Sequence, residues 1–191
     1  MSELLLRPAR PDEVDAVGAL TVAGYDADAY LTLPDGSFDH DYAGWLADGA
    51  TRSRDGMLIV AVQSEAARGL APPPGDGDVL LGTVTWCPPG SPLREVSTRD
   101  DQGEFRTLSV APEARGRRVG SALVDWCITE ARTTGLAEIL LSTLPEMKPA
   151  HRLYESRGFI RRPDLDWSPF PDVVLWGFSL TLRGNAGTVS T

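Results

Sequence analysis

The chain has 191 residues, of which 42% are hydrophobic and 24% are charged, as is typical of one globular domain with its own core. No apolar run approaches the roughly 20 residues that a membrane helix needs, and residues 4–6 are too short an apolar stretch for a signal peptide. Two cysteines, Cys87 and Cys127, are too few for a disulfide framework, so we expect a cytoplasmic protein.

The net charge of −9 is unevenly distributed along the chain. Residues 1–101 contain seven arginines and 17 acidic residues, a net −10, whereas residues 102–191 contain 11 basic and 10 acidic residues, a net +1. Nucleic-acid-binding proteins carry basic patches, so the acidic half argues against such a partner. It would attract a cationic substrate such as an amine, or it only keeps the protein soluble.

The first half of the chain is predicted to hold one strand, two helices and two further strands. Residues 4–9 are typical of a strand, and 11–25 of a helix with Pro11 in its first turn. A second helix is predicted at 38–49, with Ser37 as its N-cap. Strands at 57–63 and 79–87 follow, separated at 69–77 by a Gly- and Pro-rich sequence that indicates an exposed loop.

The second half begins with a polar loop at 88–103. It continues with a strand at 104–110, a helix at 119–133 with Gly135 as its C-cap, a strand at 136–144, a short helix at 149–157 that Gly158 ends, strands at 159–162 and 173–182, and a frayed tail at 183–191. This order predicts a mixed α/β sheet with helices on its faces, in a single domain spanning 1–182.

The turn at 115–120 lies between a predicted strand and a predicted helix. The first amides of a helix have no partner in the helix and carry partial positive charge, so they attract phosphate groups. Gly116 and Gly120 allow close approach of a ligand, and Arg115, Arg117 and Arg118 add charge. The turn matches neither a P-loop nor the dinucleotide fingerprint. It is either a phosphate site or an ordinary turn with exposed arginines.

The strand before this turn has an irregular pattern. Phe105, Leu108 and Val110 break the two-residue alternation of a regular strand. A β-bulge near Thr107 would restore the alternation, and a strand buried on both faces is the alternative.

Two segments resemble the signatures of the GNAT superfamily of acetyltransferases. Residues 108–123 (Leu-Ser-Val-Ala-Pro-Glu-Ala-Arg-Gly-Arg-Arg-Val-Gly-Ser-Ala-Leu) are similar to its acetyl-CoA motif, Arg/Gln-x-x-Gly-x-Gly/Ala after a strand. Residues 150–159 (Ala-His-Arg-Leu-Tyr-Glu-Ser-Arg-Gly-Phe) are similar to its second signature, a helix with a tyrosine that ends in Gly-Phe. The resemblance implies an α/β (α+β) fold: a mixed, mainly antiparallel twisted sheet, flanked by helices and splayed at the acyl-CoA site. Arg118 stands where the motif has its first glycine, and Met147 where an asparagine is frequent.

The resemblance further implies an acyl-CoA-dependent N-acetyltransferase that moves an acetyl group from acetyl-CoA to a primary amine of a small molecule by direct transfer. The implied cofactor contacts are Leu108, Ser109, Val110, Arg115, Gly116, Arg117, Arg118, Val119, Gly120 and Ser121. By the same resemblance, the Val110 amide faces the thioester oxygen and Tyr154 donates a proton to the leaving thiolate. Glu104, six residues before Val110, is the candidate base. The alternatives are that Tyr154 is a core residue, that Glu104 is an exposed residue, or that water molecules act as the base. Asp101 is a weaker candidate for the base.

The amine is expected to be selected by the first two helices, the loop at 88–103 and the last loop. The residues to consider are Tyr25, Tyr30, Asp35, Asp39, His40, Trp86 and Trp167, each of which could be structural instead. Two histidines, His40 and His151, are too few and too isolated to indicate a metal site. Cys87 is expected to be a buried inert thiol rather than an acyl carrier.

Two other functions remain open at this point: acetylation of a peptide or protein amine, and acyl-CoA sensing without catalysis. Neither nucleic acid nor a membrane is an expected partner. Because this family often forms dimers, a homodimer is the expected candidate assembly.

Overall fold

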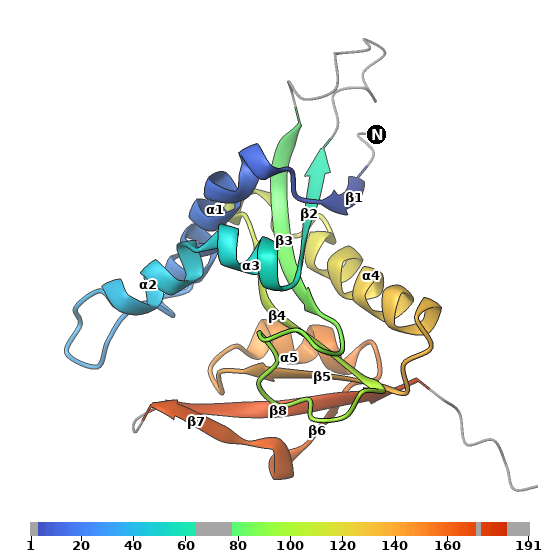
Figure 1. Ribbon diagram of the computed structural model, residues 1–191. Coiled ribbons are helices and arrows are strands. Elements are labelled where there is room, and N and C mark those ends of the chain that lie inside the picture. Colours follow the sequence, from blue (N-terminus) through green and yellow to red (C-terminus); the bar gives the residue numbers. More distant parts are fainter. Residues whose placement is uncertain (1–3, 64–77, 171–172, 183–191) are drawn as a thin grey trace, which may run out of the picture. The chain divides into compact units, whose positions relative to one another are not determined.

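The computed structural model describes residues 4–63, 78–170 and 173–182 (Figure 1). The predicted loop at 69–77 and the predicted tail at 183–191 lie outside these described residues. The chain divides into two compact units. Met1–Trp86 and Thr107–Trp126 form the first unit, and Cys87–Arg106 and Cys127–Thr191 form the second. Strand β4 (Gln102–Val110) and helix α4 (Val119–Thr133) run through both units.

The strands follow the order β1 (Leu4–Pro8), β2 (Met57–Gln63), β3 (Val79–Cys87), β4, β5 (Glu138–Thr143), β8 (Val173–Thr181) and β6 (Ile160–Arg161), and β7 (Trp167–Phe170) pairs with β8. Among the strand pairs whose register is described, only β4 with β5 is parallel, and the others are antiparallel. The predicted mixed, mainly antiparallel sheet is therefore confirmed. The β4–β5 register runs only from Gln102↔Glu138 to Glu104↔Leu140, although both strands continue beyond it.

In the first unit, β1 (Leu4–Pro8), β2 (Met57–Gln63) and β3 (Val79–Cys87) pair as antiparallel neighbours. A short 3-10 turn, η1 (Pro11–Glu13), leads into α1 (Val14–Asp26). Alternate residues of β2 pack against this helix: Val17 is buried together with Leu58, Val60 and Val62. The residues on one face of the strand and the apolar stripe of the helix thus form one core, and residues 58–62 of the strand are buried on both of its faces.

The predicted helix at 38–49 and its cap were wrong in detail. The structure has two helices, α2 (His40–Ala47) and α3 (Gly49–Asp55). Asp39, rather than Ser37, caps α2 by accepting the Tyr42 amide at 2.9 Å. Asp48 caps α3 by accepting the Thr51 amide at 2.8 Å, and its non-helical backbone separates the two helices.

The second unit contains β5 (Glu138–Thr143), α5 (Lys148–Glu155), β6 (Ile160–Arg161), η4 (Pro163–Leu165), β7 (Trp167–Phe170) and β8 (Val173–Thr181). Helix α5 packs on β8 through His151 against Trp176, and through Tyr154 against Phe178. Strand β7 was not predicted. It contains Pro169, whose missing amide is tolerated because β7 lies at a sheet edge and, among the described strands, pairs only with β8.

The remaining boundaries agree with prediction within a few residues. Helix α4 begins and ends where expected. Strand β4 begins two residues earlier than predicted, at Gln102, and the predicted strand at 159–162 shortens to β6.

Candidate functional site

The turn between β4 and α4 is the best candidate for an anion site in the first unit. A 3-10 turn, η3 (Pro112–Ala114), is followed by two residues with left-handed backbone, Gly116 at φ +75° and Arg118 at φ +63°. Within the described residues, the amides of Arg118, Val119, Gly120 and Ser121 have no hydrogen-bond acceptor, whereas the next amide, of Ala122, donates to the Arg118 carbonyl at 3.0 Å. Successive free amides at a helix start fit a pyrophosphate.

The three arginines of the turn have different surroundings. Arg115 donates to both carboxylate oxygens of Asp28, at 2.8 and 3.0 Å, and to the Gly24 carbonyl at 3.0 Å. It therefore ties the turn to the end of α1. Arg117 donates to Gln63 at 2.6 Å. The Arg118 guanidinium has no hydrogen-bond or ion-pair partner among the described residues, so its charge is the one most readily offered to a ligand.

Strand β4 is irregular where the sequence predicted a bulge. Thr107 has φ +49°, a left-handed value that interrupts the extended backbone. Immediately after it come Leu108, Ser109 and Val110, the predicted cofactor segment. The Ser109 hydroxyl donates to the Thr21 carbonyl at 3.4 Å.

Helix α1 approaches this segment very closely. A Cβ added to Gly24 would lie 2.1 Å from the Ser109 hydroxyl oxygen and 3.2 Å from the Val110 carbonyl oxygen. Only glycine allows this approach without a shift of the neighbouring atoms. The helix end and the predicted cofactor segment are thus in direct contact within the first unit.

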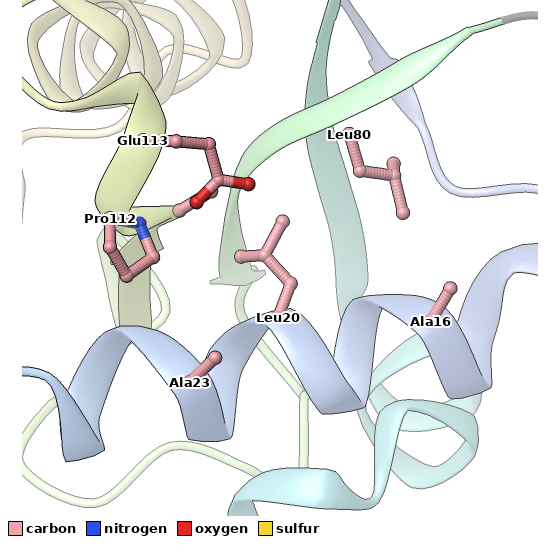
Figure 2. Close-up of a pocket in the computed structure, with 7 residues that line it drawn as sticks. Ala16, Leu20, Ala23, Leu80, Pro112 and Glu113 are labelled. Atoms are coloured by element: carbon pink, nitrogen blue, oxygen red, sulfur yellow. The ribbon is translucent and has the colours of Figure 1, made fainter.

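A pocket of about 240 Å³ lies beside η3 in the first unit. Figure 2 shows Ala16, Leu20 and Ala23 of α1 lining it, with Leu80 of β3 and with Pro112 and Glu113 of η3. Its lining is mainly apolar, and Glu113 supplies a carboxylate at its edge. It flanks the strand end that leads into the 115–120 turn.

Tyr154 lies on α5 in the second unit and is only 5% exposed. Its ring meets three phenylalanine rings at centroid distances of 5.8 to 6.2 Å: Phe105 of β4, Phe159, and Phe178 of β8. These edge and tilted contacts, typical of aromatic clusters, hold the ring in one place.

Glu104 lies on β4 in the second unit and is 1% exposed. Its Oε2 accepts from the amides of Glu95, Val96 and Ser97 and from the Ser97 hydroxyl, all at 2.9 to 3.1 Å. Its Oε1 accepts only the Glu95 amide, at 3.0 Å, among the hydrogen bonds of the described residues. Each carboxylate oxygen has about two lone-pair sites, so Oε1, with one donor, retains one for a further donor.

Alternate residues of β4 hold the loop that precedes the strand. Gln102 accepts the amides of Thr98 and Arg99, each at 3.0 Å. Arg106 donates to the Leu93 carbonyl at 2.7 Å and pairs with Glu95. Glu104 lies between them on the same face of the strand. Together these side chains order the segment 93–99, which the composition predicted only to be part of a polar loop.

The residues considered for amine selection have structural partners. Asp39 caps α2, and Asp35 accepts the Ser37 amide and hydroxyl. Trp86 is 1% exposed, and the Trp167 indole donates to Ser142 at 3.0 Å. Among the aromatic rings of the first unit, Tyr25 pairs edge to face with Tyr30 and Tyr42, and Phe38 pairs edge to face with His40.

The other predicted residues have the following surroundings. Burial, together with the charge of the neighbouring Glu104 carboxylate, raises the pKa of the Cys87 thiol to about 12, so this thiol is inert near neutral pH. Met147 accepts a hydrogen bond from Thr143 at 3.5 Å through its sulfur, where the family's asparagine would offer an amide. Asp101 pairs with Arg99 at 2.8 Å.

Neither a metal site nor a membrane-spanning helix is found in the described part of the chain. No group of three or more metal-ligating side chains occurs among residues 4–63, 78–170 and 173–182. In the same ranges, no helix has the length and apolarity required to cross a bilayer.

Residues 36–159 match the model of the acetyltransferase (GNAT) family. A curated relative, aminoalkylphosphonate N-acetyltransferase of Salmonella typhimurium, is 40% identical over 57 residues, which are 30% of this chain and 37% of that protein. The chain spans at most half the length of the curated relatives it matches.

Solved structures share the fold over almost the whole chain. The structure of yncA from Salmonella typhimurium with its cofactor acetyl-CoA has a TM-score of 0.60 at 16% identity and covers 100% of both chains. Spermidine N-acetyltransferase from Vibrio cholerae, in complex with CoA and spermine, has a TM-score of 0.61 at 19% identity and covers 95% of this chain and 96% of that chain.

Proposed function

Because this chain belongs to the GNAT family of acetyltransferases, we propose that it transfers an acetyl group from acetyl-CoA directly to a primary amine of a small molecule. The observation that carries the proposal is the run of free amides at 118–121, behind two left-handed residues. Relatives named for aminoalkylphosphonate and spermidine acetylation support a small amine as the acceptor.

The cofactor, when bound, supplies an acyl thioester, and this chain supplies the groups that hold it. The amides of 118–121 would donate hydrogen bonds to the pyrophosphate oxygens, with the Arg118 guanidinium as an added cation. Leu108, Ser109 and Val110 would hold the pantetheine arm, and the Val110 amide would donate to the carbonyl oxygen as negative charge develops there. Arg115 and Arg117 act on the cofactor mainly by fixing the turn, since both have protein partners.

Tyr154 would protonate the departing thiolate. Support comes from its place in the Tyr-x-x-x-Gly-Phe signature and from the aromatic rings that fix its position. A positioned acid of this kind is typically worth on the order of 10²–10⁴ in rate.

Glu104 is our proposed base, acting through Oε1, directly or through a water. Glu104→Gln should reduce turnover by about 10²-fold or more if the carboxylate accepts the proton. Ser97→Ala is the matched control, because it removes one loop contact to Oε2 and keeps the carboxylate. Equal losses in both variants would mean that Glu104 only anchors the loop, and unchanged turnover in Glu104→Gln would leave a water path as the base.

The proposed function is tested by thiol release from acetyl-CoA with a panel of acceptors. The panel contains a triamine (spermidine), an aminophosphonate and a peptide with a free N-terminus. Turnover of a small amine is expected. A preference for the peptide would favour peptide acetylation, and tight acetyl-CoA binding without turnover on any acceptor would favour a sensor.

The amide cradle is tested by calorimetry with a truncated ligand. Acetyl-pantetheine lacks the pyrophosphate and the nucleotide, so it should bind about 100-fold more weakly than acetyl-CoA, corresponding to two or more charge-assisted hydrogen bonds at roughly 1.5 kcal/mol each. Equal affinity for the two ligands would contradict a pyrophosphate site at 118–121.

A further inference from the structure

An arginine is buried in the first unit, on the short helix α3. Arg52 is 3% exposed, whereas Arg54 on the same helix has a side chain that is 67% exposed and pairs with Asp55. Arginine is rarely buried unless its donors find acceptors, so a buried guanidinium indicates a specific arrangement of oxygen atoms around it.

The Arg52 guanidinium joins three other elements, and its partners on two of them lie 31 and 55 residues away in the sequence. One terminal nitrogen donates to the Thr21 hydroxyl of α1 at 3.2 Å and to the Leu46 carbonyl of α2 at 2.9 Å. The other terminal nitrogen donates to the Thr107 hydroxyl of β4 at 3.4 Å. The planar fork of arginine suits such a three-way junction, because its donors point in fixed directions.

Thr107 is the residue that needs such support. A β-branched residue with left-handed backbone is a rare outlier, and residues of this kind persist only where the surroundings hold them. The Thr107 hydroxyl is held from both sides, by Arg52 and by the Thr85 hydroxyl of β3 at 2.7 Å. The backbone direction at 107 determines where the next three residues lie.

We infer that Arg52 is a positioning residue for acyl transfer, which holds Thr107 in its left-handed conformation and thereby aims the 108–110 backbone at the thioester. The inference rests on the proposed function, in which the Val110 amide serves the reacting carbonyl. Because Arg52 also contacts α1 and α2, it fixes these helices to the same strand position.

A purely structural role for Arg52 predicts a different result at position 107. Glycine adopts a φ of +49° without steric cost, so Thr107→Gly removes the need for a residue that enforces this conformation. If Arg52 acts through Thr107, replacing Arg52 should matter less in the Thr107→Gly background. If Arg52 only stabilises the unit, its replacement should cost the same factor in both backgrounds.

The experiment measures kcat and the acetyl-CoA KM for Arg52→Met, Thr107→Gly and the double variant, with Arg54→Met as the exposed control on the same helix. Arg52→Met should lower kcat by about 10- to 100-fold with a much smaller change in KM, the expected result of misplacing a reacting group. In the Thr107→Gly background the loss should shrink to about threefold or less. Arg54→Met should match the wild type.

A second readout is independent of turnover. Hydrogen exchange in a peptide that covers 105–111 should be faster in Arg52→Met than in Arg54→Met. Where Arg52→Met fails to fold, Arg52→Lys and Thr107→Val replace it: lysine keeps the charge without the fork, and valine keeps the shape of threonine without the hydroxyl. Each should lower kcat by about tenfold.

The outcomes separate this inference from the proposed function. Equal losses of kcat in both backgrounds, or a wild-type kcat in Arg52→Met and Arg52→Lys, would overturn the positioning role while the enzyme remains active. Absence of turnover in the wild type on every acceptor would instead reject the proposed function. In that case, hydrogen exchange at 105–111 that is unchanged in Arg52→Met would show that Arg52 does not hold this part of β4.

Discussion

Arg118 occupies a backbone conformation that normally belongs to glycine. Its φ of +63° costs a non-glycine residue about 1–2 kcal/mol, which explains why the family pattern has glycine at this place. The chain compensates by bringing a guanidinium to the amide cradle without a protein partner among the described residues. At Arg118, the cost of backbone strain is therefore set against the benefit of a positive charge for ligand binding.

Two substitutions at Arg118 separate these effects. Arg118→Gly should stabilise the free protein by about 1 kcal/mol, because the strain is removed. It should weaken acetyl-CoA binding about three- to fivefold, the value of an exposed ion pair. Arg118→Gln keeps the strain and loses the charge, so it should weaken binding equally without the stability gain. Urea unfolding and calorimetry measure both quantities, and tighter binding by Arg118→Gly would show that the side chain obstructs the site.

Tyr154→Phe removes one hydroxyl and keeps the ring in its aromatic surroundings. We expect turnover to fall on the order of 10²-fold or more, because the thiolate loses its acid, while the calorimetric affinity for coenzyme A stays within about twofold. Turnover equal to that of the wild type would refute the acid role. A parallel loss of coenzyme A affinity would indicate a binding role instead.

At the scale of elements, α1 packs against the end of α2 through a glycine. A Cβ on Gly18 would lie 2.1 Å from the Ala47 carbonyl oxygen, a backbone atom that cannot move by itself. Gly44, in the middle of α2, is exposed, and a Cβ there meets no atom within 4 Å. The two glycines thus differ in packing while both lie in helices.

Alanine at these positions should have opposite effects on the free energy of unfolding. Gly18→Ala gains about 1 kcal/mol of helix propensity but loses roughly 1–3 kcal/mol to overpacking, so we expect net destabilisation. Gly44→Ala should stabilise by about 0.5–1 kcal/mol, since only the propensity changes. Urea unfolding of both variants checks the pair, and stabilisation by Gly18→Ala would mean that the helices separate easily.

The sequence predicted elements well where one local signal dominates. Helix α4 has an apolar period and a glycine after its end, and its bounds were predicted correctly. An irregularity near Thr107 could be expected because a change of parity in apolar residues has few explanations, and the structure has a left-handed φ at this residue. The family signatures predicted the sheet class by resemblance.

Tertiary contacts decide what the sequence could not predict. Both Ser37 and Asp39 are good caps, and the choice depends on Asp35, which takes up the Ser37 hydroxyl at 2.6 Å. Arg115 was expected to offer charge to a ligand, yet its partner Asp28 lies 87 residues earlier in the chain. Arg52 could not be distinguished from Arg54 by sequence, since burial comes from elements that meet only in the fold.

At the scale of the whole molecule, the net charge of −9 should influence which amines react fastest. An acidic protein raises the local concentration of cations and lowers that of anions, and salt screens both effects. At about 0.1 M salt the Debye length is near 10 Å, so steering by the overall charge is largely lost. The local concentration of a triply charged amine is raised most by the acidic protein. An aminophosphonate carries a negative group, so its local concentration changes in the opposite direction.

We therefore expect kcat/KM for the triamine to fall several-fold between about 20 and 200 mM NaCl, with acetyl-CoA saturating so that its own binding does not limit the rate. Over the same range kcat/KM for the aminophosphonate should rise or stay constant. Sucrose at matched osmolality is the control, because it changes water activity without screening charge. Equal salt dependence of the two acceptors would mean that the acidic residues act only as solubilising surface and that the acceptor is selected by contacts within the site.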